Sequence, residues 1–104
     1  MRIYLSGPIT NNPNYQAQFA EAADRVRALG HEPINPVNLQ FVLDPLATSW
    51  DEYMTLCRPL LRVCDAIYML DGWQYSRGAQ VEFYDAWGCD MIIFRTLEEI
   101  TEAV

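Results

Sequence analysis

The stretch D-A-I-Y-M-L-D-G-W-Q-Y-S-R-G-A-Q-V-E-F-Y-D-A-W-G (residues 65–88) contains the elements that decide the fold. Residues 65–70 form a short apolar run of β-prone side chains, which is typical of a buried strand. A polar loop follows at 71–75, and residues 76–87 predict a helix that Gly88 closes. The turn from strand to helix, 71–82, suits a small anionic or sugar-bearing ligand, because the start of a helix offers free backbone N–H groups.

The same alternation of strand and helix runs through the rest of the chain. The predicted strands are 2–6, 31–35, 65–70 and 91–94, and the predicted helices are 16–29, about 50–63, 76–87 and 96–103, with Thr96 as the N-cap of the last. This order argues for an α/β fold with a parallel sheet of four to five strands and helices on both faces. No repeat, linker or low-complexity segment divides residues 1–104, so a single domain is expected.

The first predicted helix has an apolar stripe and a clear end. Phe19, Ala23, Val26 and Leu29 fall on one face. Gly30 follows the last of them, as a C-terminal cap should. This helix is therefore expected to pack on the sheet through that stripe.

The middle of the chain is the least regular part. Residues 37–48 predict a loop or a short helical turn. Ser49 then precedes Asp51 and Glu52, which is a strong helix start. Pro59 lies inside the helix that follows, so either the helix kinks there or Pro59 opens a second helix at its first turn.

The charge of the chain excludes several classes of function. The formal net charge is −7, and all seven basic residues are Arg. An acidic chain without a basic cluster is a poor candidate for binding nucleic acid. The absence of Lys excludes a Walker-type phosphate loop and Schiff-base chemistry. A domain of 104 residues buries a limited core, so association with a second subunit is plausible.

The cysteines do not indicate a metal site. Cys57, Cys64 and Cys89 form no C-x-x-C pair, and His31 is the only histidine. They are expected to be buried, reduced thiols of a cytoplasmic protein. No signal peptide is expected, and no membrane span is expected either, since no apolar run approaches about 20 residues. No cofactor is implied.

Ligands of open α/β sheets bind beyond the carboxyl ends of the strands. The loops expected there are 6–15, 71–76 and the region around Arg95. Ser76 is a plausible N-cap, and Arg77 could add a positive charge. Glu82 either points back along the helix into this cleft, as a nucleophile or base, or is an ordinary surface charge.

Aromatic residues near the same edge have two interpretations. Tyr4 is either a core residue or a hydroxyl that reaches the strand ends. Trp73 and Tyr75 could stack on a planar base, form a dimer contact or cover the edge of the sheet.

Three motifs together resemble a small bacterial and phage family. They are I-Y-L-S-G-P-I-T (3–10), A-L-G-H-E-P-I-N-P (28–36) and C-D-A-I-Y-M-L-D-G-W-Q-Y-S-R-G-A-Q-V-E (64–82). That family is similar to the nucleoside 2-deoxyribosyltransferases and the deoxynucleoside 5'-monophosphate N-glycosidases. The resemblance spans nearly the whole chain, and the D-G-W-x-x-S-x-G-A-x-x-E pattern is its most specific part.

The resemblance implies a flavodoxin-like three-layer sandwich that assembles as a homodimer or higher homo-oligomer. It implies cleavage or transfer at the N-glycosidic bond of a nucleoside or its 5'-monophosphate, by the logic of a retaining glycosidase. Glu82 matches the nucleophile, and Tyr4 matches a tyrosine beside it. Substrate contacts are expected from a further set of residues, with Ser76 at the 5'-phosphate: Gly7, Ile9, Asp71, Trp73, Ser76, Arg77 and Gly78.

One position departs from the family pattern. An Asp is expected eight residues before Asp65, and the chain has Cys57 there. A thiol cannot replace a carboxylate in holding sugar hydroxyls or protonating a base. Either Asp51, Glu52 or Asp71 takes over, or the chain binds a nucleotide without turning it over well. A third interpretation is an interaction protein that uses exposed Trp50, Trp73 and Phe41.

Overall fold

The computed structural model describes residues 1–103 and contains a four-stranded parallel sheet. Its strands, in the spatial order β2-β1-β3-β4, are β1 (Arg2–Ser6), β2 (Glu32–Ile34), β3 (Ala66–Met69) and β4 (Ile92–Phe94). The chain moves from β1 outward to β2, returns, and continues on the other side through β3. This order is that of flavodoxin-like folds, so the predicted fold class is confirmed. The strand order reverses between β1 and β3, which is where such folds bind ligands.

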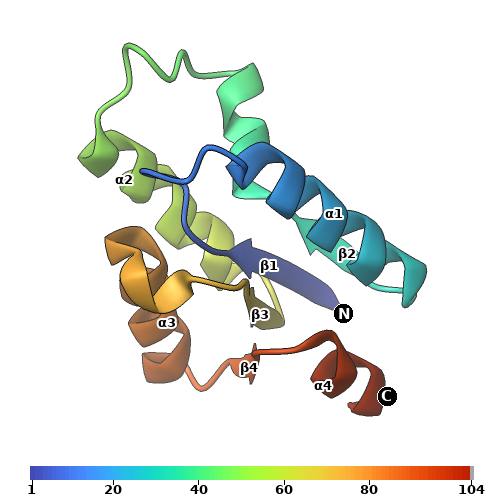
Figure 1. Cartoon of the computed structure of the whole chain (residues 1–104). Coiled ribbons are helices and arrows are strands. Elements are labelled where there is room, and N and C mark those ends of the chain that lie inside the picture. The colour runs from blue at the N-terminus through green and yellow to red at the C-terminus, as the bar shows by residue number, and fades with distance from the viewer. Residues whose placement is uncertain (104) are drawn as a thin grey trace.

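Helices cover both faces of the sheet (Figure 1). They are α1 (Tyr15–Ala28), α2 (Trp50–Arg62), α3 (Arg77–Gly88) and α4 (Leu97–Glu102), with the short 3-10 helices η1 (Pro36–Phe41) and η2 (Trp73–Tyr75). In Figure 1, α2 and α3 lie to the left of the sheet and α1 and α4 to its right. Each pair of helices packs on its own apolar cluster. The predicted three layers are therefore present.

Alternation along β1 assigns its side chains to the two faces. Ile3 and Leu5 belong to the core under α1 and α4. Tyr4 belongs to the core under α2 and α3, and the side chain of Ser6 points the same way, toward α3. Because successive side chains of a strand point to opposite faces, β1 presents two hydroxyl groups to α3.

Helix α2 begins at a complete capping box. The Ser49 side chain accepts a hydrogen bond from the Glu52 N–H, and the Glu52 carboxylate accepts one from the Ser49 N–H. The helix then runs through Pro59 to Arg62 without a break, so the alternative of two helices is wrong. Pro59 has no N–H, so the Thr55 carbonyl lacks its helical hydrogen bond. Both residues are exposed, and water can bind that carbonyl instead.

Two predicted helix ends need correction. Helix α1 ends at Ala28, and Gly30 adopts φ +87° two residues later, as a stop signal requires. Leu29 was predicted on the buried stripe but is 36% exposed, because it lies beyond the helix. Gly88 does not close α3: it is the last helical residue, and the chain turns at Asp90 with φ 55°.

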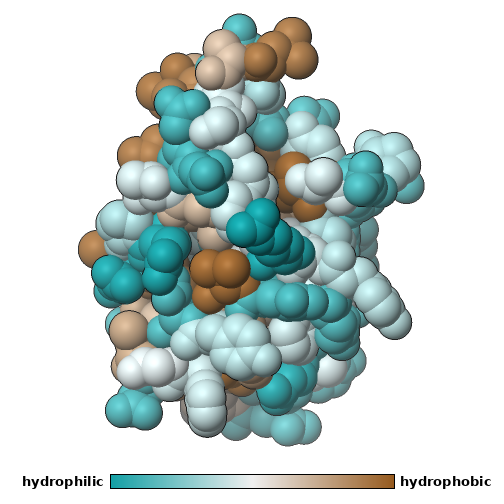
Figure 2. Space-filling view, turned by 90° about the vertical axis from the view of Figure 1, so that its left-hand side faces the viewer, coloured by the Kyte–Doolittle hydropathy of each residue, from teal (hydrophilic) through white to brown (hydrophobic). Residues whose placement is uncertain are grey.

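The face formed by α2 and α3 is mostly hydrophilic (Figure 2). Across it, the Arg58 guanidinium binds the Asp85 carboxylate through two hydrogen bonds of 2.7 and 2.9 Å, which tie α2 to α3. Hydrophobic atoms gather at the upper end, at the level of the segment that joins η1 to α2. Phe41 is exposed, as predicted, but Trp50 and Trp73 are half-buried, so the predicted exposure of these two indoles is wrong.

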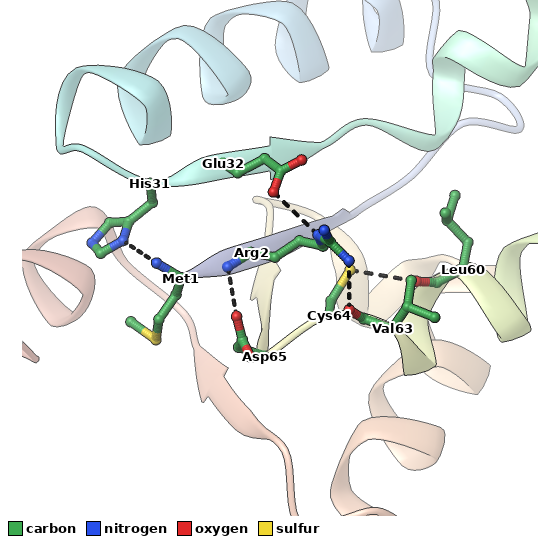
Figure 3. Close-up of polar contacts among 8 residues, drawn as sticks. All are labelled: Met1, Arg2, His31, Glu32, Leu60, Val63, Cys64 and Asp65. Atoms are coloured by element: carbon green, nitrogen blue, oxygen red, sulfur yellow. Dashed lines mark hydrogen bonds and ion pairs between the residues drawn. The ribbon is translucent and has the colours of Figure 1, made fainter.

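Polar contacts tie the strands together at their N-terminal ends (Figure 3). The Arg2 side chain donates to Glu32 and to the Val63 carbonyl at 3.1 Å each, and the Arg2 N–H donates to the Asp65 carboxylate at 2.7 Å. The N-terminal amine lies 3.0 Å from Nδ1 of His31. These contacts hold β1, β2 and the start of β3 in register.

The cysteines are free thiols in the structure. Cys57 and Cys64 are buried, as predicted, but Cys89 is exposed, because it follows the end of α3 rather than facing the sheet. Within residues 1–103, no helix has the length and apolar character needed to cross a membrane.

Candidate active site

A cavity of about 620 Å³ opens at the carboxyl ends of β1 and β3. Its walls come from the loop after β1, the start of α1, η1 with the segment that follows it, and the starts of α2 and α3. The volume is within the range of small-molecule sites. The site therefore forms where the topology of the sheet predicts it.

Glu82 lines this cavity although it is only 6% exposed. It lies in the second turn of α3 and points at β1. The Tyr4 hydroxyl donates a hydrogen bond to Oε2, and the Ser6 hydroxyl donates to Oε1 at 2.8 Å. The alternative of a surface charge is wrong. Both carboxylate oxygens are oriented from behind by β1, and the group has no cationic partner among the described residues.

Burial controls the protonation of this carboxyl. Desolvation raises the pKa of Glu82 from 4.5 to about 7, and the negative charge of Asp85 adds to the effect. The hydrogen bonds from Tyr4 and Ser6 act in the opposite direction, because they favour the charged form. The pKa of Tyr4 is raised well above its usual value by burial and by Glu82, so Tyr4 is a donor here and not an anion.

The start of α3 forms one wall as the sequence predicts. Ser76 is the N-cap, with its side chain accepting from the Ala79 N–H at 3.2 Å, and Ser76, Arg77 and Gly78 all line the cavity. The Arg77 guanidinium lies over the Trp50 ring at 4.1 Å from its centre. A cation and a helix N-terminus therefore meet at one side of the cavity.

The loop after β1 contributes Gly7 and Ile9. A Cβ at Gly7 would lie 2.9 Å from the Cβ of Leu70, so no larger residue fits between β1 and β3 at this point. Both residues were predicted as substrate contacts, and both line the cavity.

Helix α2 supplies a wall that the sequence analysis missed. Trp50, Tyr53 and Met54 line the cavity, and Cys57 is buried one turn further along. Their i, i+3, i+4, i+7 spacing was the available signal, since it places them on one face of a helix. The Tyr53 hydroxyl donates to the Pro36 carbonyl at 2.8 Å, which links this wall to η1.

A family assignment follows from the sequence itself. The profile of the family described as domain of unknown function DUF4406 matches residues 1–94. The chain belongs to the DUF4406 family. No curated protein matches the sequence.

A solved structure shares the fold of this DUF4406 domain. It is a 2-deoxyribosyltransferase from Leishmania mexicana, with a TM-score of 0.65 and 21% sequence identity. The match covers 88% of this chain but 61% of the other, so this chain spans less than two thirds of that protein. The likeness confirms the predicted resemblance at the level of the fold.

In this DUF4406 domain Cys57 stands close to the carboxylate. Burial raises the pKa of the Cys57 thiol to about 11, with the charge of Glu82 adding to the effect and the neighbouring hydroxyls of Tyr4 and Tyr53 opposing it. Asp51, Glu52 and Asp71, the suggested replacements for the expected Asp, are exposed and lie outside the cavity. Among residues 1–103, Glu82 is therefore the one acid that lines it.

Some predicted residues of the DUF4406 site lie elsewhere. The Asp71 side chain is exposed, and its carbonyl accepts a hydrogen bond from Gln18. The Trp73 ring stacks on Phe83 at 4.8 Å between centres, and the Arg95 guanidinium also lies over the Phe83 ring. The structure does not bring these residues to the cavity, whereas Tyr75 lines its rim. In the described part of the chain, no group of His, Cys, Asp and Glu could hold a metal ion.

Proposed function

We propose that this domain cleaves or transfers the N-glycosidic bond of a nucleoside or nucleoside 5'-monophosphate, with Glu82 as the nucleophile. The Glu82 carboxylate attacks C1' of the sugar, the base departs, and a glycosyl-enzyme ester forms. Water or a second base then attacks C1' and releases Glu82, so that configuration is retained. Hydrolysis and transfer differ only in this acceptor.

One observation carries the proposal: a buried carboxylate faces a cavity and is oriented through both oxygens by Tyr4 and Ser6. Burial without a cation is costly for a carboxylate, so such a group is a candidate for chemistry. The fold shared with a 2-deoxyribosyltransferase supports the choice of reaction.

The substrate contacts follow from the walls of the cavity. Ser76, Arg77 and Gly78 would receive a 5'-phosphate at the start of α3, and Gly7 and Ile9 would border the nucleotide. Tyr4 holds Glu82 and does not itself react. Asp71 and Trp73 lie outside the cavity and take no part in this proposal.

The test is release of free base from a panel of deoxynucleosides and their 5'-monophosphates, followed by chromatography. Glu82→Gln should abolish release, whereas Glu21→Gln, an exposed residue paired with Arg25 on α1, should not change it. A second base added to the reaction distinguishes transfer from hydrolysis. The proposal fails if no nucleoside or nucleotide is cleaved at high enzyme concentration.

A second candidate is a binding module that senses a nucleotide without cleaving it. The thiol of Cys57, at the position where the resemblance implies a carboxylate, favours it. It predicts stabilisation by a nucleotide, about 2.7 kcal/mol at a hundred times the dissociation constant, with no product. A thermal shift without base release would support it, and the absence of any shift would exclude it for the nucleotides tested.

We further propose that residues 1–104 act as one domain in the cytoplasm, as a homodimer or higher homo-oligomer. Exposed Phe41, Val42 and Leu46 beside the cavity favour association of copies. Light scattering of the purified protein tests this, and a strictly monomeric protein would contradict it.

A further inference from the structure

The cavity is poor in groups that can donate a proton and rich in aromatic surface. Among residues 1–103, its lining contains one acid, Glu82, and one cation, Arg77. Its aromatic residues are Tyr15, Phe19, Trp50, Tyr53 and Tyr75. The hydroxyls of Tyr15 and Tyr53 already donate to Gln40 and to the Pro36 carbonyl, and Tyr75 is 93% exposed at the rim.

This composition limits which bases can depart. An ordinary purine or pyrimidine leaves as an anion unless an acid protonates it, and such an acid contributes about 10²- to 10⁴-fold. Glu82 cannot attack C1' and protonate the base in the same step. The Tyr4 hydroxyl is bound to Glu82, and burial keeps the thiol of Cys57 a weak acid.

We propose that the preferred substrate is a pyridinium N-glycoside, a nucleoside or nucleotide whose base carries a fixed positive charge. This inference rests on the proposed function and names its substrate class. A pyridinium base leaves as a neutral molecule and needs no proton, so one carboxylate is sufficient for both steps.

The reaction balances without a further reactant. An oxygen of the Glu82 carboxylate forms a bond to C1' while the C1'–N⁺ bond breaks, and the bonding pair stays on the ring nitrogen as a neutral pyridine. Water then attacks C1', the ester bond to Glu82 breaks, and the carboxylate is restored. The proton from the water goes to solvent.

The cavity also suits the charge of such a base. Glu82 is buried, and its hydrogen-bond partners are the neutral hydroxyls of Tyr4 and Ser6, so a cationic base placed next to it would supply the opposite charge that no side chain of residues 1–103 pairs with it. Aromatic faces attract cations, and the Arg77 guanidinium over Trp50 shows this contact within the same cavity. A neutral base would gain neither interaction.

The first test compares nicotinamide mononucleotide and nicotinamide riboside with uridine, adenosine and their 5'-monophosphates, which carry the same ribose. We expect kcat/KM for the pyridinium compounds to exceed that for the neutral bases by at least about 100-fold, the value of the missing acid. Glu82→Gln should abolish cleavage of both classes, and Glu21→Gln should change neither.

A second test measures binding alone, with two ligands that have no glycosidic bond to cleave. 1-Methylnicotinamide, a pyridinium cation methylated on the ring nitrogen, and nicotinamide, its neutral counterpart, differ by a methyl group and a charge. We expect the cation to bind at least about tenfold more tightly above pH 8, and Glu82→Gln to remove the preference. Equal binding of the two would overturn the electrostatic argument.

The outcomes separate the inference from the proposed function. Cleavage of neutral bases as fast as pyridinium compounds, dependent on Glu82, would overturn the inference and leave the proposed function standing. Cleavage of neither class would overturn both. Preferential cleavage of pyridinium compounds that is lost in Glu82→Gln supports both.

Discussion

The two ends of the parallel sheet hold their carboxylates in opposite ways. At the N-terminal ends of the strands, Glu32 and Asp65 are exposed and meet the side chain and the N–H of Arg2 (Figure 3). At the carboxyl ends, Glu82 is buried, and its partners are the neutral hydroxyls of Tyr4 and Ser6. Tyr4 and Ser6 belong to the same strand as Arg2, so β1 serves both ends.

The difference shows how one sheet separates stability from chemistry. Exposed ion pairs are solvated in the folded and unfolded states alike, so they contribute little. A carboxylate taken out of water without a cation destabilises the fold, which makes such a group a candidate for chemistry. The pKa of Glu82 is shifted upward through burial, in agreement with a candidate site at the carboxyl ends of the strands.

The largest expected effect is the loss of activity in Glu82→Gln. The amide keeps the shape of the side chain but cannot form an ester with the sugar, so kcat/KM should fall by roughly 10³-fold or more. Base release by chromatography measures it. Glu32→Gln, at the other end of the sheet, should retain full activity, and an equal loss there would remove the distinction between the two ends.

The next effect is the dependence of stability on pH. The raised pKa of Glu82 means that the folded state holds a proton that the unfolded state has lost between pH 4.5 and about 7. Stability from this group is therefore complete below pH 4.5 and declines as pH rises through 7.

Glu82→Gln should remove this decline. Relative to the wild type, the variant should gain on the order of 3 kcal/mol of unfolding free energy between pH 4.5 and 8. Urea denaturation at both values measures the difference. An unchanged gap between the two proteins would mean that the Glu82 carboxyl titrates as it does in the unfolded chain.

A smaller effect is expected from Tyr4→Phe. The change leaves Oε2 of Glu82 without its donor, at a cost of about 1–3 kcal/mol. Because this hydrogen bond favours the charged form, its loss should raise the pKa of Glu82 further and shift the acidic limb of the pH–rate profile upward.

Tyr53→Phe is the matched control for that shift. It removes a hydroxyl from the same cavity, but one that donates to the Pro36 carbonyl and not to Glu82. The acidic limb should stay in place in this variant. If both variants moved the acidic limb equally, the shift in Tyr4→Phe would not be due to the lost hydrogen bond between Tyr4 and Glu82.

The smallest effect is expected at the opposite end of the sheet. Arg2→Gln removes an exposed ion pair with Glu32 and an exposed hydrogen bond to the Val63 carbonyl, so Tm should change by no more than a few degrees and activity should not change. The difference from wild type should shrink further at high salt, which screens exposed charges. Scanning calorimetry at low and high salt measures both, and a large loss of stability would place a second critical network here.

Much of the fold could be predicted because its signals are local. The alternation of strands and helices, the caps at Ser49 and Ser76, and the stop at Gly30 each depend on a few adjacent residues. The parallel arrangement then follows from the order of the elements. The prediction that Gly88 closes α3 was wrong, because the turn after α3 is made by Asp90.

The lining of the cavity was predicted only in part. Gly7, Ile9, Ser76, Arg77, Gly78 and Glu82 all line the cavity. Asp71 and Trp73, between them in the motif, turn away, because the 3-10 helix η2 directs Trp73 onto Phe83. The wall from α2 was missed, since no local pattern shows which helix faces which part of a sheet.

By itself, the sequence determined the order of the elements, the fold class and the turn at which α3 begins, because hydrophobic periodicity and capping act over a few residues. The tertiary structure alone decided that Glu82 is buried, that Tyr4 and Ser6 bind its two oxygens, and that it is the only acid in the cavity among residues 1–103. Tyr4 and Glu82 lie 78 positions apart. Their contact, and the pKa shift that comes with it, exist only once β1 and α3 have packed together.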